Sequence, residues 1–311
     1  MMWQRAFLVF WAVLTIAGCD QIDGLFATPP PPAPTVPVVT EGVSPESAEL
    51  QAFYARVEQG HRTRGLLRID GGGPDVPYDA DRLARTFEAV AFSREFSNIG
   101  AQLVRQETDS MLHRWVEPVR FEPIFGASVP VAQRVDDIAA IQRFAARLGR
   151  ATGHPVSFVE RNGNFRVLIL SEEERKVSGP LLQRLLPGIR EQEISVIQNL
   201  GRESYCVVVA ADPDSTGELS QAIAVIRAEL PPLLRLSCVH EELAQGMGLA
   251  NDSPTARPSI FNDDDEFGRL TSMDEAMLGM LYDPRLSPGI DAETARPIVR
   301  ALAKAQFSTS F

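Results

Sequence analysis

Residues 238–285, CVHEELAQGMGLANDSPTARPSIFNDDDEFGRLTSMDEAMLGMLYDPR, are the stretch of this chain that decides the fold. They begin inside a longer apolar pattern, 231–249, which predicts a helix that starts at two prolines. Residues 274–282 predict a second helix. Between the two lies a polar segment with prolines and no periodicity, which is typical of an irregular connection.

Upstream of this stretch, helical and strand patterns alternate. Residues 131–152 carry apolar side chains at helical spacing and precede Gly153, which predicts a helix with a glycine stop. The pair Asn162-Gly163 predicts a hairpin between strands at 156–160 and 164–170. The other expected helices are 47–65, 79–96 and 172–186, and the other expected strands are 115–121, 204–210 and 219–226.

The order of these elements predicts the fold class. Runs of strands interrupted by single helices are typical of an α+β fold in which helices pack on a mixed sheet. The apolar run 204–210 predicts a buried strand, whereas the alternation in 219–226 predicts an edge strand. We therefore expect 219–226 to be the sheet edge that is open to a partner.

The stretch 238–285 resembles the active-site region of matrixin-type (metzincin) peptidases, and the resemblance extends over 115–285. That family carries H-E-x-x-H-x-x-G-x-x-H, a methionine turn and a final helix. Here Gly248 matches the glycine, residues 258–261 stand at the methionine turn, and 274–282 match the final helix. The chain is also similar to an uncharacterised family of proteobacterial lipoproteins with a Glu-Glu-x-x-Gln helix. The resemblance implies a zincin-like mixed sheet preceded by an N-terminal helical segment.

The resemblance also implies a site. Alignment on the family glycine places the metal-ligand positions at Glu241, Gln245 and Asn251, and the catalytic glutamate at Glu242. A glutamate, a neutral amide and an asparagine are a weak set for zinc, which prefers histidine, cysteine and carboxylate ligands. We therefore expect no cofactor. The alternative is that the site binds a divalent metal, zinc. His240 is one residue out of frame and is expected on the helix surface or at a cap.

Three functions remain open at this point. The first is a degenerate peptidase-like module, a pseudoenzyme, that binds a protein or peptide at the old cleft by strand addition. The second is a metal-dependent peptidase or other hydrolase in which Glu242 is the general base. The third is an envelope-assembly role for the helices in 47–96.

The N-terminal residues predict export and lipid anchoring. An early arginine, an apolar stretch from Ala6 to Ile16 and the sequence Ile-Ala-Gly-Cys ending at Cys19 resemble a bacterial lipoprotein signal. We expect a signal peptide at 1–18, lipidation of Cys19 and a proline-rich tether at 19–46. The expected location is the periplasmic side of the inner membrane, with the outer membrane as the alternative, and the expected partners are the membrane and an envelope protein or peptide.

The rest of the chain is expected to divide into a helical segment at 47–105, a matrixin-like α+β domain at 106–290 and a C-terminal tail at 291–311. Export leaves Cys206 and Cys238 as a disulfide candidate, and the alternative is two buried thiols. The formal net charge of -11 and the lack of a basic cluster argue against a nucleic-acid partner.

Overall fold

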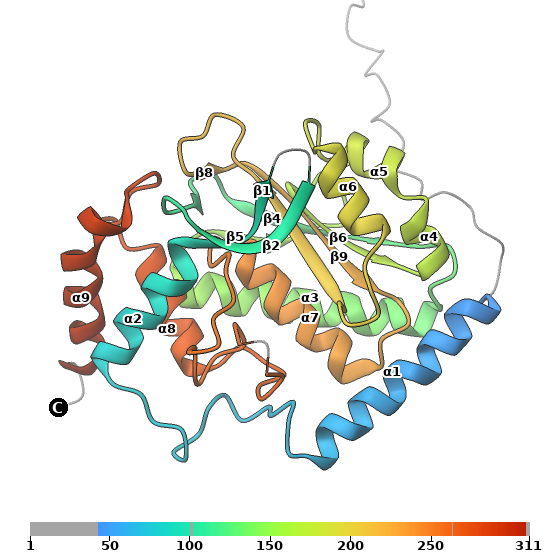
Figure 1. Ribbon diagram of the computed structural model, residues 1–311, viewed down its shortest axis with the longest axis horizontal. Helices are drawn as coiled ribbons and strands as arrows, with labels where there is room; N and C mark the ends of the chain where they lie inside the picture. The colour runs from blue at the N-terminus through green and yellow to red at the C-terminus, as the bar shows by residue number, and fades with distance from the viewer. Residues whose placement is uncertain (1–42, 100–101, 263, 309–311) are drawn as a thin grey trace, which may run out of the picture. The chain divides into compact units, whose positions relative to one another are not determined.

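The computed structural model describes residues 43–99, 102–262 and 264–308 of the chain, which lie in one compact unit (Figure 1). The expected signal peptide, Cys19 and the tether up to residue 42 lie outside the described residues. No helix among the described residues is both long enough and apolar enough to span a bilayer.

A five-stranded mixed sheet with the order β5-β4-β6-β9-β7 organises the fold. Its strands are β4 (Val119–Phe125), β5 (Val156–Phe158), β6 (Phe165–Leu170), β7 (Cys206–Ala211) and β9 (Gln221–Arg227). Strands β5, β4, β6 and β9 run parallel to one another, and β7 pairs antiparallel with β9 at one edge. The predicted α+β fold with a mixed sheet is therefore confirmed.

The predicted hairpin at Asn162-Gly163 is wrong. Strands β5 and β6 do not pair with each other, because both pair parallel with β4, one on each side. Phe121 is the partner of the last residue of β5 and of the first residue of β6, so the short connection only has to cross β4. A Cβ on Gly163 would lie 2.5 Å from Cβ of Glu122, which explains the glycine at this crossing.

The predicted edge strand is also wrong. Strand β9, which covers most of 219–226, lies inside the sheet between β6 and β7, and its alanines 222 and 224 are fully buried. Strand β7, expected to be buried, is the edge strand and is only partly buried. The apolar side chains of β7 pack against the apolar clusters on the two faces of the sheet. Such side chains do not show whether another strand pairs with the outer edge of β7.

Helices cover both faces of the sheet (Figure 1). On one face, α3 (Val131–Thr152) and α7 (Pro232–Gln245) lie side by side over the larger core. A smaller apolar cluster on the other face lies beneath α5 (Gly179–Leu185) and α6 (Glu191–Gln198), which follow α4 (Glu172–Lys176). Residues 172–186 thus form two short helices in place of the single predicted one.

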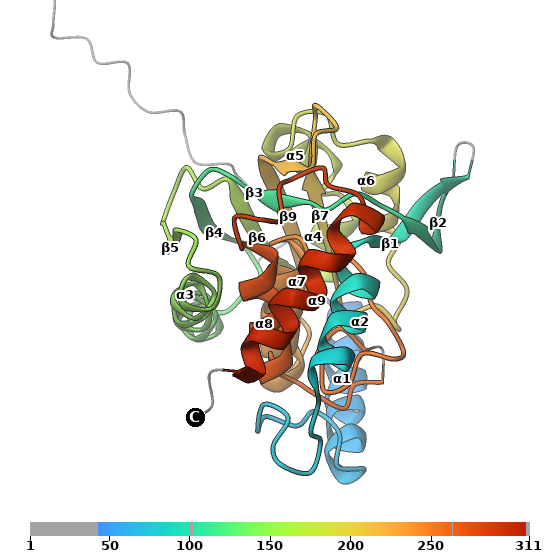
Figure 2. The same cartoon turned by 90° about the vertical axis from the view of Figure 1, so that its left-hand side faces the viewer.

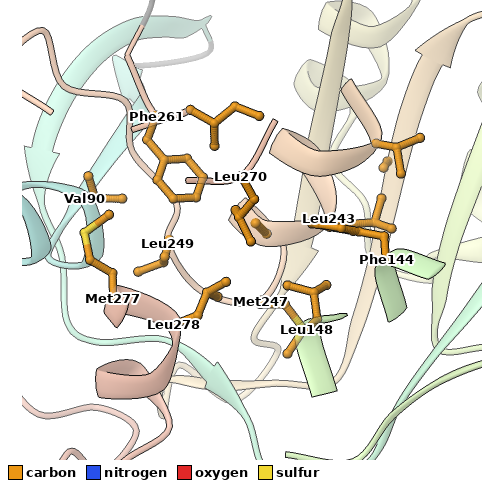
Figure 3. Packing of buried hydrophobic residues seen from close by; sticks show 14 of the residues in the cluster. Val90, Phe144, Leu148, Leu243, Met247, Leu249, Phe261, Leu270, Met277 and Leu278 are labelled. Atoms are coloured by element: carbon orange, nitrogen blue, oxygen red, sulfur yellow. The ribbon is translucent and has the colours of Figure 1, made fainter. Parts of the chain in front are cut away.

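The remaining helices extend the larger core. Helix α2 (Ala80–Ala91) runs beside α9 (Ala292–Ser308), and both contact α8 (Ser272–Leu281), as Figure 2 shows. The expected tail at 291–311 therefore begins with a helix. Figure 3 shows side chains of α3, α7 and α8 in this core, among them Phe144, Leu243 and Met277.

Helix α1 (Pro45–Thr63), two pairs of strands and one isolated bridge lie outside the central sheet and its covering helices. Leu50 and Tyr54 of α1 are buried in the same core as the sheet. Strands β1 (Ser93–Ile99) and β2 (Gln102–Asp109) form an antiparallel hairpin that the sequence analysis did not anticipate. Two-residue strands β3 (Arg114–Trp115) and β8 (Glu218–Leu219) pair parallel, and Arg68 forms an isolated bridge with Phe267.

Candidate binding cleft

A cavity of about 610 Å³ lies along the edge strand β7. Residues 206–210 of β7 form one wall, and the C-terminal half of α7 forms another. Helix α6, the segment 200–205 before β7 and the irregular segment between α7 and α8 add to the lining, and residues between the end of α2 and β3 contribute as well. The cavity therefore occupies the place where an additional strand would meet the sheet.

Strand β7 alternates between the two apolar clusters of the fold. Cys206 and Val208 pack against the larger core, whereas Val207 and Val209 pack against the smaller cluster under α6. One edge of β7 pairs with β9, and no strand pairs with its second edge among the residues that the structure describes. This arrangement fixes the side chains of β7 while leaving one edge of its backbone on the cavity side.

Helix α7 presents a polar face to the same cavity. Ser237, Glu241 and Gln245 follow one another at a spacing of four residues, and Glu242 lies beside them. Glu242 is 5% exposed and Gln245 is 7% exposed, so both are almost enclosed. The structure thus brings together three of the four residues that the sequence analysis placed in a site.

The fourth residue, Asn251, is directed elsewhere. Its side-chain amide donates to the carbonyl of Ala89 at 3.1 Å, and its backbone N–H donates to the carbonyl of Val90 at 3.2 Å. Both carbonyls belong to α2. The neighbouring Asp252 lines the cavity instead and accepts a hydrogen bond of 2.9 Å from the Gln245 amide. The sequence analysis missed Asp252, although this carboxylate follows directly after the third expected ligand position, Asn251.

A disulfide between Cys206 and Cys238 joins the two walls of the cleft, with the Cα atoms 6.0 Å apart. This confirms the expected pairing. It links the first residue of β7 to α7, one turn before Glu241 and Glu242. The bond closes a loop with a sequence separation of 32 residues, which in the chain-entropy model is worth about 3–4 kcal/mol.

His240 is not on the helix surface, as the sequence suggested, but 8% exposed and directed into the core. Its ring stacks on Phe144 with centroids 4.2 Å apart, and its Nδ1 accepts the backbone N–H of Leu270 at 3.0 Å. Burial lowers the pKa of His240 from 6.5 to about 3. The neutral ring therefore anchors the segment before α8 to α7.

This anchor predicts a pH dependence of stability. His240 is neutral in the folded protein down to about pH 3, whereas in the unfolded chain it protonates below about 6.5. The unfolded state then binds the extra proton, so the free energy of unfolding falls by up to about 1.4 kcal/mol per pH unit as the pH drops. We expect His240→Asn, which keeps an acceptor for Leu270, to lose this contribution in urea unfolding between pH 7 and pH 4. Parallel pH profiles for the two proteins would contradict it.

The turn at residues 258–261 is built around a buried carboxylate. Asp274 is fully buried and accepts hydrogen bonds from the Ser259 hydroxyl at 2.5 Å and the Ile260 N–H at 3.0 Å. The backbone and hydroxyl of Thr271, at the start of α8, bind the same carboxylate. Burial raises the pKa of Asp274 while these donors oppose the rise. Ile260 is thereby held against the cavity.

The cavity is strongly acidic. Six carboxylates line it, namely Glu193, Glu203, Glu241, Glu242, Asp252 and Asp265. Among the described lining residues, only Arg190 and His113 oppose them, and Arg190 is paired with Glu193 while His113 lies 3.3 Å from Asp212. Tyr205 adds a phenol whose pKa burial raises to about 12. The chemistry of this lining favours a cationic occupant.

The donor set at the cleft does not match a catalytic zinc site. Within the described part of the chain, the one group of three candidate ligands is Cys206, Glu241 and Glu242. The Cys206 sulfur is bonded to Cys238, which leaves two carboxylates and a neutral amide. Zinc sites with an open water position use three strong protein ligands. The side chains at the cleft of the disulfide-bonded protein therefore do not fit a catalytic zinc ion.

Fold and site together define a mixed α+β protein with an acidic cleft along a disulfide-tied sheet edge. A family model described as a protein of unknown function, DUF2927, matches residues 80–301, and the chain belongs to this family. The match runs from α2 into α9, so it includes the sheet and the whole cleft. This match is consistent with the expectation of an uncharacterised family. No curated protein and no solved structure matches the chain significantly.

Proposed function

We propose that the protein is an exported, lipid-anchored binding protein whose cleft holds an extended, basic segment of another polypeptide. The observation that carries the proposal is the position of β7, an antiparallel edge strand that forms a wall of the cavity. An extended peptide can add to such an edge through backbone hydrogen bonds, while its side chains enter neighbouring pockets. The carboxylates of the lining supply the preference for Lys and Arg.

The matrixin-like interpretation is part of the proposal. Helix α7 follows β9 directly and runs beside the antiparallel edge strand, as expected for a peptidase-like domain in which substrate lies along the sheet edge. The polar face of α7 retains the glutamate pair Glu241 and Glu242 but not a zinc ligand set. These features support binding over hydrolysis.

Export and anchoring are proposed from residues 1–46 and from the cysteines. Cys19 stands at the end of a lipobox-like sequence, and a proline-rich spacer would separate the cleft from the membrane. The Cys206–Cys238 disulfide favours an oxidising compartment such as the periplasm. The partner is accordingly an envelope protein or peptide.

The test is a binding measurement with a panel of short unstructured peptides that differ in charge. We expect Lys- and Arg-rich peptides to bind, acidic peptides of the same length not to bind, and affinity to fall as salt is added. The double variant Glu241→Gln/Glu242→Gln should weaken binding by about tenfold or more. Each close ion pair between one of these carboxylates and a Lys or Arg of the peptide is expected to contribute more than about 1.4 kcal/mol. Glu293→Gln, on α9 and outside the cleft, is the matched control.

Two results would overturn the proposal or replace it. Equal binding of acidic and basic peptides would remove the role of the carboxylates. Cleavage of a bound peptide that Glu242→Gln abolishes would instead favour the second candidate, a hydrolase, since Glu242 lines the cavity where a general base would be needed.

A further inference from the structure

A mixed cluster of potential metal ligands lies where the disulfide meets the cleft. The Cys206 sulfur and one carboxylate oxygen each of Glu241 and Glu242 lie within 4.8 Å of one another. The sulfur comes from the edge strand and the carboxylates come from α7, and all three residues line the cavity. The cluster joins the two walls of the cleft.

We propose that reduction of the Cys206–Cys238 disulfide converts this cluster into a site for a thiophilic divalent cation such as Zn²⁺ or Cd²⁺. A sulfur in a disulfide carries no charge and is a poor ligand, whereas a thiolate is a strong one. Ligands around one zinc ion lie about 3–4 Å apart, since each is about 2.0–2.3 Å from the metal. The three atoms therefore need only a small adjustment to converge.

The redox step requires a dithiol donor, either a small molecule or a reductase protein. Cys238 is 1% exposed, whereas Cys206 is partly exposed on the cavity, so the donor thiolate attacks the Cys206 sulfur. Cys238 leaves as a thiolate and takes up a proton. The second thiol of the donor then displaces Cys206 and forms the donor's own disulfide, so that two electrons and two protons have passed to the protein.

The reduced site differs from the histidine-based frame that the peptidase resemblance implies. Its sulfur ligand lies on β7, outside the helix, and binding of the cation releases the Cys206 thiol proton. The cation would also neutralise the repulsion between the new thiolate and the two carboxylates. Three protein ligands leave a fourth position that faces the cavity.

The test uses the full chain with Cys19→Ser throughout, so that Cys206 and Cys238 are its two cysteines, and Cd²⁺ as the probe, because cadmium thiolates absorb in the ultraviolet. We expect one Cd²⁺ per chain with the thiolate absorption after treatment with a dithiol and its removal, and no such absorption from the oxidised protein. Cys238→Ser, which leaves Cys206 free, should bind Cd²⁺ without reductant, and Cys206→Ser should not. Glu241→Gln and Glu242→Gln, each in the Cys238→Ser background, should weaken Cd²⁺ binding by more than about tenfold. A loss of about tenfold is already typical when a residue that only supports a metal ligand is replaced.

Glu203→Gln in the same background is the control, because Glu203 lines the cavity outside the cluster. Since loss of the disulfide lowers stability, the rise in melting temperature on adding Cd²⁺ is measured as well, and it should appear for Cys238→Ser and not for Cys206→Ser. Equal Cd²⁺ binding by the two serine variants, or by the oxidised protein, would overturn the proposal. So would the lack of stoichiometric binding by Cys238→Ser.

Discussion

Replacing Gly248 by alanine is expected to destabilise the protein by about 3–5 kcal/mol, through backbone strain and overpacking combined. Gly248 has a φ of 123°, which side chains rarely adopt, and a Cβ there would lie 2.0 Å from the carbonyl oxygen of His113. The glycine ends the helical region of α7 and lines the cavity, so the strain would fall directly on the cleft. For a domain of this size the melting temperature should drop by about 10 °C.

The matched control for this substitution is Gly60→Ala. Gly60 lies in α1 with no atom within 4 Å of its Cβ position, and it has no positive φ. Alanine there should stabilise the protein by about 0.5–1 kcal/mol. If Gly248→Ala unfolds at the same temperature as the wild type while Gly60→Ala behaves as expected, the close approach to His113 is not a feature of the native protein.

Replacing Arg227 by methionine is expected to cost about 3–5 kcal/mol, because it removes one of the two buried arginines that pair with Glu172 and leaves three backbone carbonyls without their charged donor. Arg227 is 1% exposed at the end of β9, and it forms an ion pair with Glu172. It also donates to the carbonyls of Leu200, Gly201 and Ser204 at 2.8–2.9 Å. These carbonyls precede β7, so the substitution should also loosen the start of the edge strand.

A double-mutant cycle tests this assignment. Glu172→Gln combined with Arg227→Met should cost clearly less than the sum of the single substitutions, as expected for groups in one network. Arg285→Met is the control, since Arg285 pairs with Asp283 on the surface, and its urea midpoint should stay close to that of the wild type. Additive costs for Glu172 and Arg227 would show that the two residues do not act together.

Local patterns predicted several elements because their causes are local. Helix α3 has the predicted bounds, since its periodicity is regular and Gly153 ends it in a left-handed conformation. Helix α8 also agrees with its local pattern, whereas the disulfide was predicted from the number of cysteines that remain after lipidation of Cys19. The Asn162-Gly163 turn does contain a left-handed residue, with φ 61° at Asn162, yet the chain then crosses β4 and pairs on its other side. Pairing across a sheet depends on distant residues that a turn signal does not contain.

The candidate site divides in the same way. Helical spacing was enough to place Glu241, Glu242 and Gln245 on one face, because all three lie on α7. Beyond Gly248 the chain is irregular, and the contact of Asn251 with α2 reverses the roles of Asn251 and Asp252. The acids that α6 and the loops contribute to the cavity, such as Glu193 and Asp265, come from elements that no sequence spacing connects to α7.

The proposal that an extended basic segment adds to β7 is tested most directly by amide hydrogen exchange with and without a bound Lys- and Arg-rich peptide. The prediction is slower exchange in Cys206–Ala211 and in the cavity-facing part of α7, with no change in α9. Backbone pairing at the strand edge would produce this pattern, whereas a purely electrostatic contact would not. Binding that leaves the exchange of β7 unchanged would contradict the account.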